Sequence, residues 1–204
     1  MGVFGWIKRI WVGILTPSRR WSVGTLLTGG FVAGIAVVAA ANTGLQATQT
    51  DQFCAYACHS MKTHVAPEWE ASAHFTNRAG VRAGCADCHL AQQFIPKMQR
   101  KIRAAWTDVP GEIFGWIDTP EKFEARRLHM AEVVWAEMKA NDSRECRSCH
   151  ERAFMDFAAQ SGRAREAHED ASKSGETCID CHKGIAHRKP DMPAEEGESE
   201  DFSL

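Results

Sequence analysis

The sequence has 204 residues, which is enough for one ordinary domain and a membrane anchor but not for a second enzyme domain. Its formal net charge of -2 provides no basic field, so the composition does not support nucleic-acid binding. One tyrosine and ten phenylalanines make a thin apolar core for this length, and the eight cysteines indicate that something else fills the interior.

The first 21 residues combine apolar and basic side chains. Between positions 3 and 15, tryptophan and isoleucine recur at helical spacing around Lys8 and Arg9. This pattern predicts a short helix that lies at a membrane interface, and Pro17 is expected to end it.

Residues 22–41 carry no charge and, at about 1.5 Å per residue, would span roughly 30 Å as a helix. We predict one transmembrane helix here, with a cleaved signal peptide as the alternative. Basic residues precede this span and Asp51 follows it, so the positive-inside rule places residues 1–21 on the cytoplasmic side. The predicted protein is therefore a single-pass membrane protein. Its domain of residues 42–190 is exported, and residues 191–204 form a disordered acidic tail.

The eight cysteines fall into four motifs, each followed by a histidine. Three motifs have the form Cys-x-x-Cys-His, and the first has one additional residue between its cysteines. The cysteine pairs are Cys54 and Cys58, Cys85 and Cys88, Cys146 and Cys149, and Cys178 and Cys181.

Two thiols at this spacing can bond to the two vinyl groups of a haem, and the next residue can bring an imidazole to the iron. The motifs therefore predict four covalently bound haem c groups. Structural zinc is an alternative, but it leaves every following histidine unexplained. Disulfides are another alternative, although such close pairs would close only very small loops.

The histidines also suggest an internal repeat. In the first half His74 lies between the motif histidines His59 and His89, and in the second half His168 lies between His150 and His182. This order predicts two di-haem halves in which the intervening histidine is a distal iron ligand. A third candidate is His187, whereas His64 and His129 are expected to be ordinary surface residues.

Short helices are expected around the haems. The clearest is predicted from Pro120 to Ala140, where Thr119 supplies a cap and an apolar stripe begins at Phe123. No window alternates as a strand would. The predicted fold is mainly α: one N-terminal transmembrane helix followed by a small multihaem domain of short helices and loops.

Four segments resemble the NapC/NirT family, including its NrfH-like branch, of membrane-anchored tetrahaem quinol dehydrogenases. The resemblance extends from the anchor to about residue 190. It is carried by the Cys-His-Ser-Met element that ends at Met61 and by residues 73–85, 141–150 and 178–187.

The resemblance implies a set of iron ligands. In the family a methionine binds the first iron and the motif histidine does not, which implies Met61 in place of His59. From the residues alone, a single methionine near such a motif is more often a packing residue than a ligand. The additional residue in the first motif also leaves the choice between His59 and Met61 open. The remaining implied ligands are His89, His150 and His182 as proximal ligands and His74, His168 and His187 as distal ligands.

The resemblance further implies which histidines share an iron and where quinol binds. The implied pairs are His187 with His89, His74 with His182, and His168 with His150. Family quinol sites place a lysine and an acidic residue beside the first haem, and Lys101 and Asp108 match these positions. Alternatively, these two residues are ordinary surface charges on a helix.

The main hypothesis is a quinol dehydrogenase that passes electrons from the membrane quinone pool to a soluble periplasmic redox partner, as in nitrate or nitrite respiration. A related version runs in reverse, from a periplasmic donor to quinone. A terminal multihaem reductase is a rival, but six histidines satisfy three irons and no Cys-x-x-Cys-Lys motif occurs. A passive membrane-tethered electron carrier without a quinol site is the third possibility.

Overall fold

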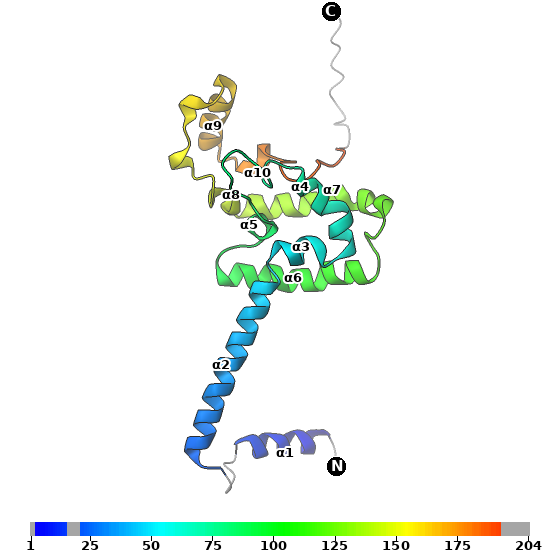
Figure 1. Cartoon of the computed structure of the whole chain (residues 1–204), viewed down its shortest axis with the longest axis vertical. Helices are drawn as coiled ribbons and strands as arrows, with labels where there is room; N and C mark the ends of the chain where they lie inside the picture. Colours follow the sequence, from blue (N-terminus) through cyan, green and yellow to red (C-terminus); the bar gives the residue numbers. More distant parts are fainter. Residues whose placement is uncertain (1–2, 16–20, 193–204) are drawn as a thin grey trace, which may run out of the picture. The chain divides into compact units, whose positions relative to one another are not determined.

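The computed structural model describes residues 3–15 and 21–192, and no β-strand occurs in these two ranges. The described residues form three long helices, one of which is largely apolar, and several shorter helices (Figure 1). The predicted mainly α fold is confirmed. Apart from its first two residues, the predicted acidic tail lies outside the described residues. The chain divides into two compact units, Met1–Thr48 and Gln49–Leu204, which we describe separately.

The first unit contains helices α1 (Val3–Leu15) and α2 (Val23–Ala47). Ser22 caps α2, because its side-chain oxygen accepts a hydrogen bond of 3.2 Å from the backbone N–H of Thr25. With 25 residues and a mean hydropathy of 2.0, α2 is long and apolar enough to cross a membrane. It continues six residues past the predicted end, since polar residues after Ala41 reduce hydropathy without breaking the helical hydrogen bonds.

The second unit carries all four cysteine motifs, most of them on very short helices. Its elements in chain order are α3 (Asp51–Tyr56), η1 (Met61–Val65, a π-helix), α4 (Ala66–Glu70), α5 (Cys85–His89), α6 (Phe94–Ile113), α7 (Pro120–Ala140), α8 (Arg144–Arg147), η2 (Arg152–Phe154), η3 (Phe157–Ala159), α9 (Gly162–Ser174) and α10 (Cys178–Cys181).

Helix α7 has the predicted bounds. The side chain of Thr119 accepts a hydrogen bond from the N–H of Lys122, and Pro120 occupies the first turn, where a missing N–H is harmless. Phe123 is buried, as the apolar stripe predicts. An arginine, Arg127, lies one turn further along the same face and is also buried.

The apolar core of the second unit is small. Among the described residues the buried hydrophobic side chains are Ala55, Ala66, Trp69, Ala91, Phe123 and Ile179. Trp69 packs edge-on against Phe75, and the Trp69 indole donates a 3.0 Å hydrogen bond to the carbonyl of Ala83. This cluster cannot by itself stabilise a unit of this size, which agrees with the thin core expected from the composition.

Candidate haem centres

Two of the cysteine motifs form one-turn helices that cap themselves. In α5 the carboxylate of Asp87 accepts a 2.8 Å hydrogen bond from the N–H of Gly84. In α10 the carboxylate of Asp180 accepts a 2.8 Å hydrogen bond from the N–H of Thr177. The aspartate before the second cysteine thus holds the turn that presents both thiols and the following histidine.

The second motif is also joined to the start of α3. Asp51 accepts a 2.8 Å hydrogen bond from the N–H of Cys85. A side-chain carbon added to Gly84 would lie 2.5 Å from the same Asp51 carboxylate oxygen, so a larger residue here would push this carboxylate away from the N–H of Cys85.

A left-handed turn positions the third motif. Asp142 and Ser143 have φ angles of 58° and 48°, which place the start of α8 directly after α7. The side chain of Ser143 is fully buried and accepts a 3.2 Å hydrogen bond from the N–H of Ile179. This buried contact joins the third motif to the fourth.

The four motifs lie beside one another in chain order. Helix α3 packs against α5, and α5 packs against α8. A hydrogen bond with the Cys85 thiol lowers the pKa of Cys54 to about 7. Burial and the neighbouring thiol of Cys146 raise the pKa of Cys88 to about 11, and burial, together with the thiol of Cys178, raises the pKa of Cys146. The eight thiols form no disulfide.

The six implied histidine ligands form three facing pairs. The ring centres are 6.2 Å apart for His89 and His187, 6.3 Å for His74 and His150, and 5.9 Å for His168 and His182. With metal–nitrogen bonds of about 2.0 Å, an iron between two imidazoles separates their ring centres by about 6.3 Å. The three pairs therefore have the spacing that an iron with two histidine ligands requires.

Two of these pairs differ from the expected ones. His187 faces His89 as predicted, but His74 faces His150 instead of His182, and His168 faces His182 instead of His150. The partners of His74 and His168 are thus exchanged. Two of the three pairs join the first half of the sequence to the second, because the second and third motifs lie side by side.

The second ring nitrogen of each distal candidate has a different environment. The Nδ1 atom of His168 lies 2.7 Å from the side-chain oxygen of Gln160, and Nδ1 of His74 lies 3.4 Å from the carbonyl of Ile185. Such bonds fix the ring and leave the other nitrogen for a metal. Nδ1 of His187 is buried, with no hydrogen-bond partner among the described residues.

His187 is instead held through the backbone of the next residue. Glu68 accepts a 2.8 Å hydrogen bond from the N–H of Arg188 and forms two hydrogen bonds, of 2.6 and 2.9 Å, with the guanidinium of Arg127. Arg127 also binds Glu124 through two hydrogen bonds and the carbonyl of Arg188 through one. We call these four residues the Arg127 cluster.

A glutamate on α6 holds the first motif. Glu112 accepts a 2.6 Å hydrogen bond from the N–H of His59, and the buried hydroxyl of Ser60 donates to the same carboxylate. Burial opposes ionisation of Glu112, but these hydrogen bonds outweigh it and lower its pKa. The turn before Met61 is fixed in this way. Met61 then begins η1 and is half-buried, whereas the His59 side chain is exposed.

Lys101 and Asp108 lie seven residues apart on α6 and therefore on similar sides of this helix. Lys101 is close enough to Cys54, and Asp108 to Cys58, to influence the ionisation of each thiol. Burial lowers the pKa of Lys101. Asp108 is exposed, accepts a 2.7 Å hydrogen bond from Thr107 and forms an ion pair of 3.5 Å with Arg100. Both predicted quinol-site residues are thus beside the first motif.

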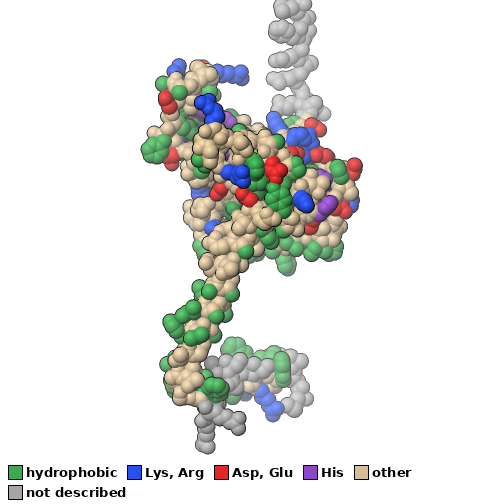
Figure 2. Space-filling model, viewed as in Figure 1, with side chains coloured by type: hydrophobic (Ala, Val, Ile, Leu, Met, Phe, Trp, Pro, Cys, Tyr) green, Lys and Arg blue, Asp and Glu red, His purple; other side chains and the backbone are tan. Residues whose placement is uncertain are grey.

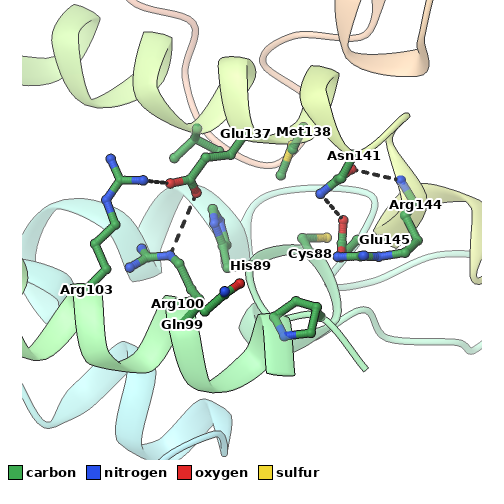
Figure 3. Close-up of a pocket in the computed structure, with 13 residues that line it drawn as sticks. Cys88, His89, Gln99, Arg100, Arg103, Glu137, Met138, Asn141, Arg144 and Glu145 are labelled. Atoms are coloured by element: carbon green, nitrogen blue, oxygen red, sulfur yellow. Dashed lines mark hydrogen bonds and ion pairs between the residues drawn. The ribbon is translucent and has the colours of Figure 1, made fainter. Parts of the chain in front are cut away.

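A cavity of about 270 Å³ opens beside Cys88 and His89, between α6 and α7 (Figure 3). Arg100 and Arg103 enter it from α6, and both form ion pairs with Glu137 of α7. Two guanidinium groups beside a cysteine motif suit a ligand that carries carboxylates, as haem does with its propionates.

Several of these residues were not predicted from the sequence. Glu112, Gln160 and Glu68 have no local signal, because each acts on a residue that is distant along the chain or on another helix. Arg127 did have a local sequence signal, since it lies four residues after Phe123 on the apolar side of α7. His64, expected at the surface, instead stacks on Phe123 at 4.8 Å between ring centres and has a buried Nε2 atom.

Comparison with known proteins identifies the family. The model of the NapC/NirT cytochrome c family, N-terminal region, matches residues 16–192, which include all four motifs and all six paired histidines. The chain belongs to the NapC/NirT cytochrome c family. It is therefore a c-type cytochrome with a role in respiratory electron transport, and this confirms the resemblance stated above.

Relatives of the NapC/NirT chain extend over most of its length. It is 52% identical over 188 residues to the cytochrome c-type protein NapC of Escherichia coli strain K12, covering 92% of each chain. It is 49% identical over 182 residues to the denitrification system component NirT of Stutzerimonas stutzeri, covering 89% of this chain and 90% of NirT. The cytochrome c-type protein TorC of Escherichia coli strain K12 is 45% identical over 186 residues, which are 47% of TorC. No solved structure matches.

Proposed function

We propose that this chain is a membrane-anchored tetrahaem cytochrome that oxidises quinol and passes the electrons to a periplasmic redox partner. The observation that carries the proposal is the arrangement of the second unit. Three histidine pairs have the spacing of iron ligands, and four cysteine motifs follow one another from the first to the fourth.

In this proposal each motif holds one haem c through its two cysteines. Haem iron, when bound, accepts and releases one electron at a time. His89, His150 and His182 supply one ligand each from their motifs, and His187, His74 and His168 supply the opposite ligands. Met61 is the ligand for the first haem, because it begins η1 directly after the turn that Glu112 fixes, whereas the His59 side chain is exposed.

Quinol oxidation releases two electrons and two protons, so a quinol site needs a group that binds the hydroxyl and a group that accepts a proton. Lys101 stabilises negative charge on the quinol oxygen, and the exposed carboxylate of Asp108 takes up the two protons one after the other, releasing each to water. Their positions beside Cys54 and Cys58 put both tasks next to the first motif.

The location of the protein and the type of its redox partner are the next parts of the proposal. Helix α2 is the single transmembrane anchor, and the haem domain lies in the periplasm of a bacterial inner membrane by the positive-inside rule. The partner is a periplasmic reductase or carrier, which the similarity to NapC and to a denitrification component supports. The similarity to a denitrification component supports flow from quinol to the partner, and the reverse reaction would use the same residues.

Replacing the two quinol-site residues tests the proposal against a passive carrier. We expect Asp108→Asn and Lys101→Ala each to slow quinol-driven haem reduction by about 100-fold or more, because general-base and charge-stabilising groups typically contribute factors of that size. Stopped-flow absorbance of the haems in a membrane preparation measures the rate. Reduction by dithionite should be unchanged.

Lys97→Ala is the matched control, because it removes the same charge one turn earlier on α6. It should leave the quinol-driven rate within about twofold of the parent, since Lys97 is only partly buried, lies outside the proposed pair and acts on Lys101 only through a minor charge repulsion. Parent-like rates in the Lys101 and Asp108 variants would contradict the quinol site and leave the tetrahaem cytochrome as a passive carrier. Fewer than four covalent haems in the mass of the mature chain would contradict the tetrahaem assignment itself.

The histidine pairing gives a separate test. If His74 and His150 bind one iron, His74→Ala and His74→Ala with His150→Ala should each disturb one haem. His74→Ala with His182→Ala should disturb two, because the rings belong to different pairs. The number of low-spin haems lost is counted by electron paramagnetic resonance. Loss of two low-spin haems in the His74 and His150 double variant would contradict the pairing.

A further inference from the structure

The three histidine pairs differ in what contacts the second ring nitrogen of the distal ligand. We name the pairs after their motifs: the second site has His89 with His187, the third His150 with His74, and the fourth His182 with His168. At the fourth site, Nδ1 of His168 lies 2.7 Å from the side-chain oxygen of Gln160. At the third, Nδ1 of His74 lies 3.4 Å from the carbonyl of Ile185. At the second, Nδ1 of His187 is buried and has no hydrogen-bond partner among the described residues.

An acceptor on this nitrogen changes the strength of the ring as a ligand. When the other nitrogen binds a metal, Nδ1 carries a hydrogen, and a hydrogen bond from it increases the basicity of the ring. A more basic ring stabilises the more positive, oxidised state of the metal, so the acceptor lowers the reduction potential of the site. The short contact with Gln160 should lower the potential most and the longer contact with Ile185 less, whereas His187 lacks this effect.

The burial of the rings acts in the same direction. His89 and His187 are both half-buried, and His89 lies between α6 and α7 (Figure 3). At the third and fourth sites the proximal rings, His150 and His182, are exposed. A site that the protein shields from water stabilises the additional positive charge of the oxidised state less well. Burial therefore raises the reduction potential of the second site relative to the other two.

A carboxylate lies close to His187 but is bound by other groups. Glu68 is near enough to influence the charge of His187. Both oxygens of Glu68 accept hydrogen bonds from the Arg127 guanidinium, of 2.6 and 2.9 Å, and one also accepts from the N–H of Arg188 at 2.8 Å. In Figure 2, acidic and basic side chains lie next to one another over the part of the second unit where Figure 1 draws α4 and α7. Arg127 thus keeps away from His187 the carboxylate that would make this ring a stronger ligand.

We propose that Gln160 and Arg127 are positioning residues that set the order of the reduction potentials at the three sites. The second site has the highest potential, the third an intermediate one and the fourth the lowest. Among these three sites, an electron that the protein takes up therefore resides mainly at the second. This inference rests on the haem ligation of the proposed function and adds the residues that make the three sites unequal.

Potentiometric titration of the full haem-loaded chain, followed by electron paramagnetic resonance, gives one midpoint for each low-spin signal. Gln160→Leu removes the acceptor at His168, and Gln160→Glu replaces it by a stronger one. We expect the lowest midpoint to rise in the first variant and to fall in the second. Each shift should be at least about tenfold in the ratio of oxidised to reduced site, which is about 59 mV for one electron. A merely structural role of Gln160 would not give shifts of opposite sign.

Arg127→Met tests the second site. It frees Glu68 to accept a hydrogen bond from His187, so the highest midpoint should fall by about tenfold. Arg126→Met is the matched control, because it removes the same charge from an exposed position of α7. It should leave every midpoint within about twofold of the parent ratio. If Arg127→Met does not fold, the two Gln160 variants test the proposed order at the fourth site by themselves.

Three results would overturn the inference: equal midpoints for the three sites of the parent, a Gln160→Leu shift in any signal other than the lowest, or an Arg127→Met shift in any signal other than the highest. Unchanged midpoints in these variants would overturn it as well. Fewer than three low-spin signals with two histidine ligands in the parent would instead contradict the ligation of the proposed function.

Discussion

Without haem attachment, the second unit is expected to lose its fold. The described residues supply six buried hydrophobic side chains, three of them alanine, and six histidines that face one another at the distance of a shared iron. Binding a group that bridges such pairs contributes directly to folding. Replacing all eight motif cysteines by alanine should therefore reduce the helical signal in far-ultraviolet circular dichroism to about that of α1 and α2, with 13 and 25 residues.

The control is a variant that lacks one haem. Cys178→Ala with Cys181→Ala removes the fourth attachment site and leaves the other three, so α3 to α7 should keep their helical signal. Limited proteolysis follows the same difference, with early cleavage across residues 49–192 in the eight-cysteine variant. A cooperative thermal transition in that variant would show that the apolar core suffices and would contradict this account.

The second large effect is expected from Arg127→Met. The Arg127 side chain is 9% exposed, and its guanidinium holds Glu68 and Glu124 through four hydrogen bonds, so removing it leaves two carboxylates without their main partner. Breaking a buried pair costs about 3–5 kcal/mol. Because Glu124 is 45% exposed, we expect about 2–4 kcal/mol, or a decrease in Tm of roughly 5–15 °C, measured by calorimetry. The Arg188 backbone that positions His187 is then less firmly held.

Arg126→Met is the matched control, since Arg126 is exposed and its guanidinium lies 5.9 Å from the Trp116 ring centre. Its cost should be below about 1 kcal/mol. The pH dependence of the stability tests whether the ion pair is the cause of this effect. Arg127, with Arg188, holds the pKa of Glu124 down to about 2, so this stabilisation is complete above about pH 4.3 and is lost as the pH falls towards 2. The difference in unfolding free energy between the parent and Arg127→Met should decrease over that pH range. A constant difference would contradict the ion-pair explanation.

Local signals predicted the elements well. The cap and proline at Thr119 and Pro120 defined the start of α7, because capping depends on residues within one turn. The start of α2 was predicted to within one residue because the uncharged run begins at Ser22. Its end was missed, since the helical hydrogen bonds continue into polar residues after Ala41. The cysteine motifs could also be recognised from the sequence, since each lies within a single turn.

Long-range arrangements were less predictable. The exchange of partners between His74 and His168 depends on which motifs pack together, and no spacing in the sequence encodes this. Glu112 acts on His59 across 53 positions, and Glu68 acts on Arg188 across 120. A carboxylate that binds a backbone N–H so far away has the same sequence context as any surface glutamate.

Two of the histidine pairs join the first half of the sequence to the second, and this affects the order in which the haem sites are completed during export. On the proposed ligation, the iron at His89 receives its second ligand from a residue 98 positions later, near the end of the haem domain. For the iron at His150 both proposed ligands are present at once, because His74 has already been translocated when the third motif emerges. During export from the N-terminus, the second haem is therefore the last to complete its ligand set. Until residue 187 is translocated, the iron held at His89 would lack the histidine that the proposed ligation gives it.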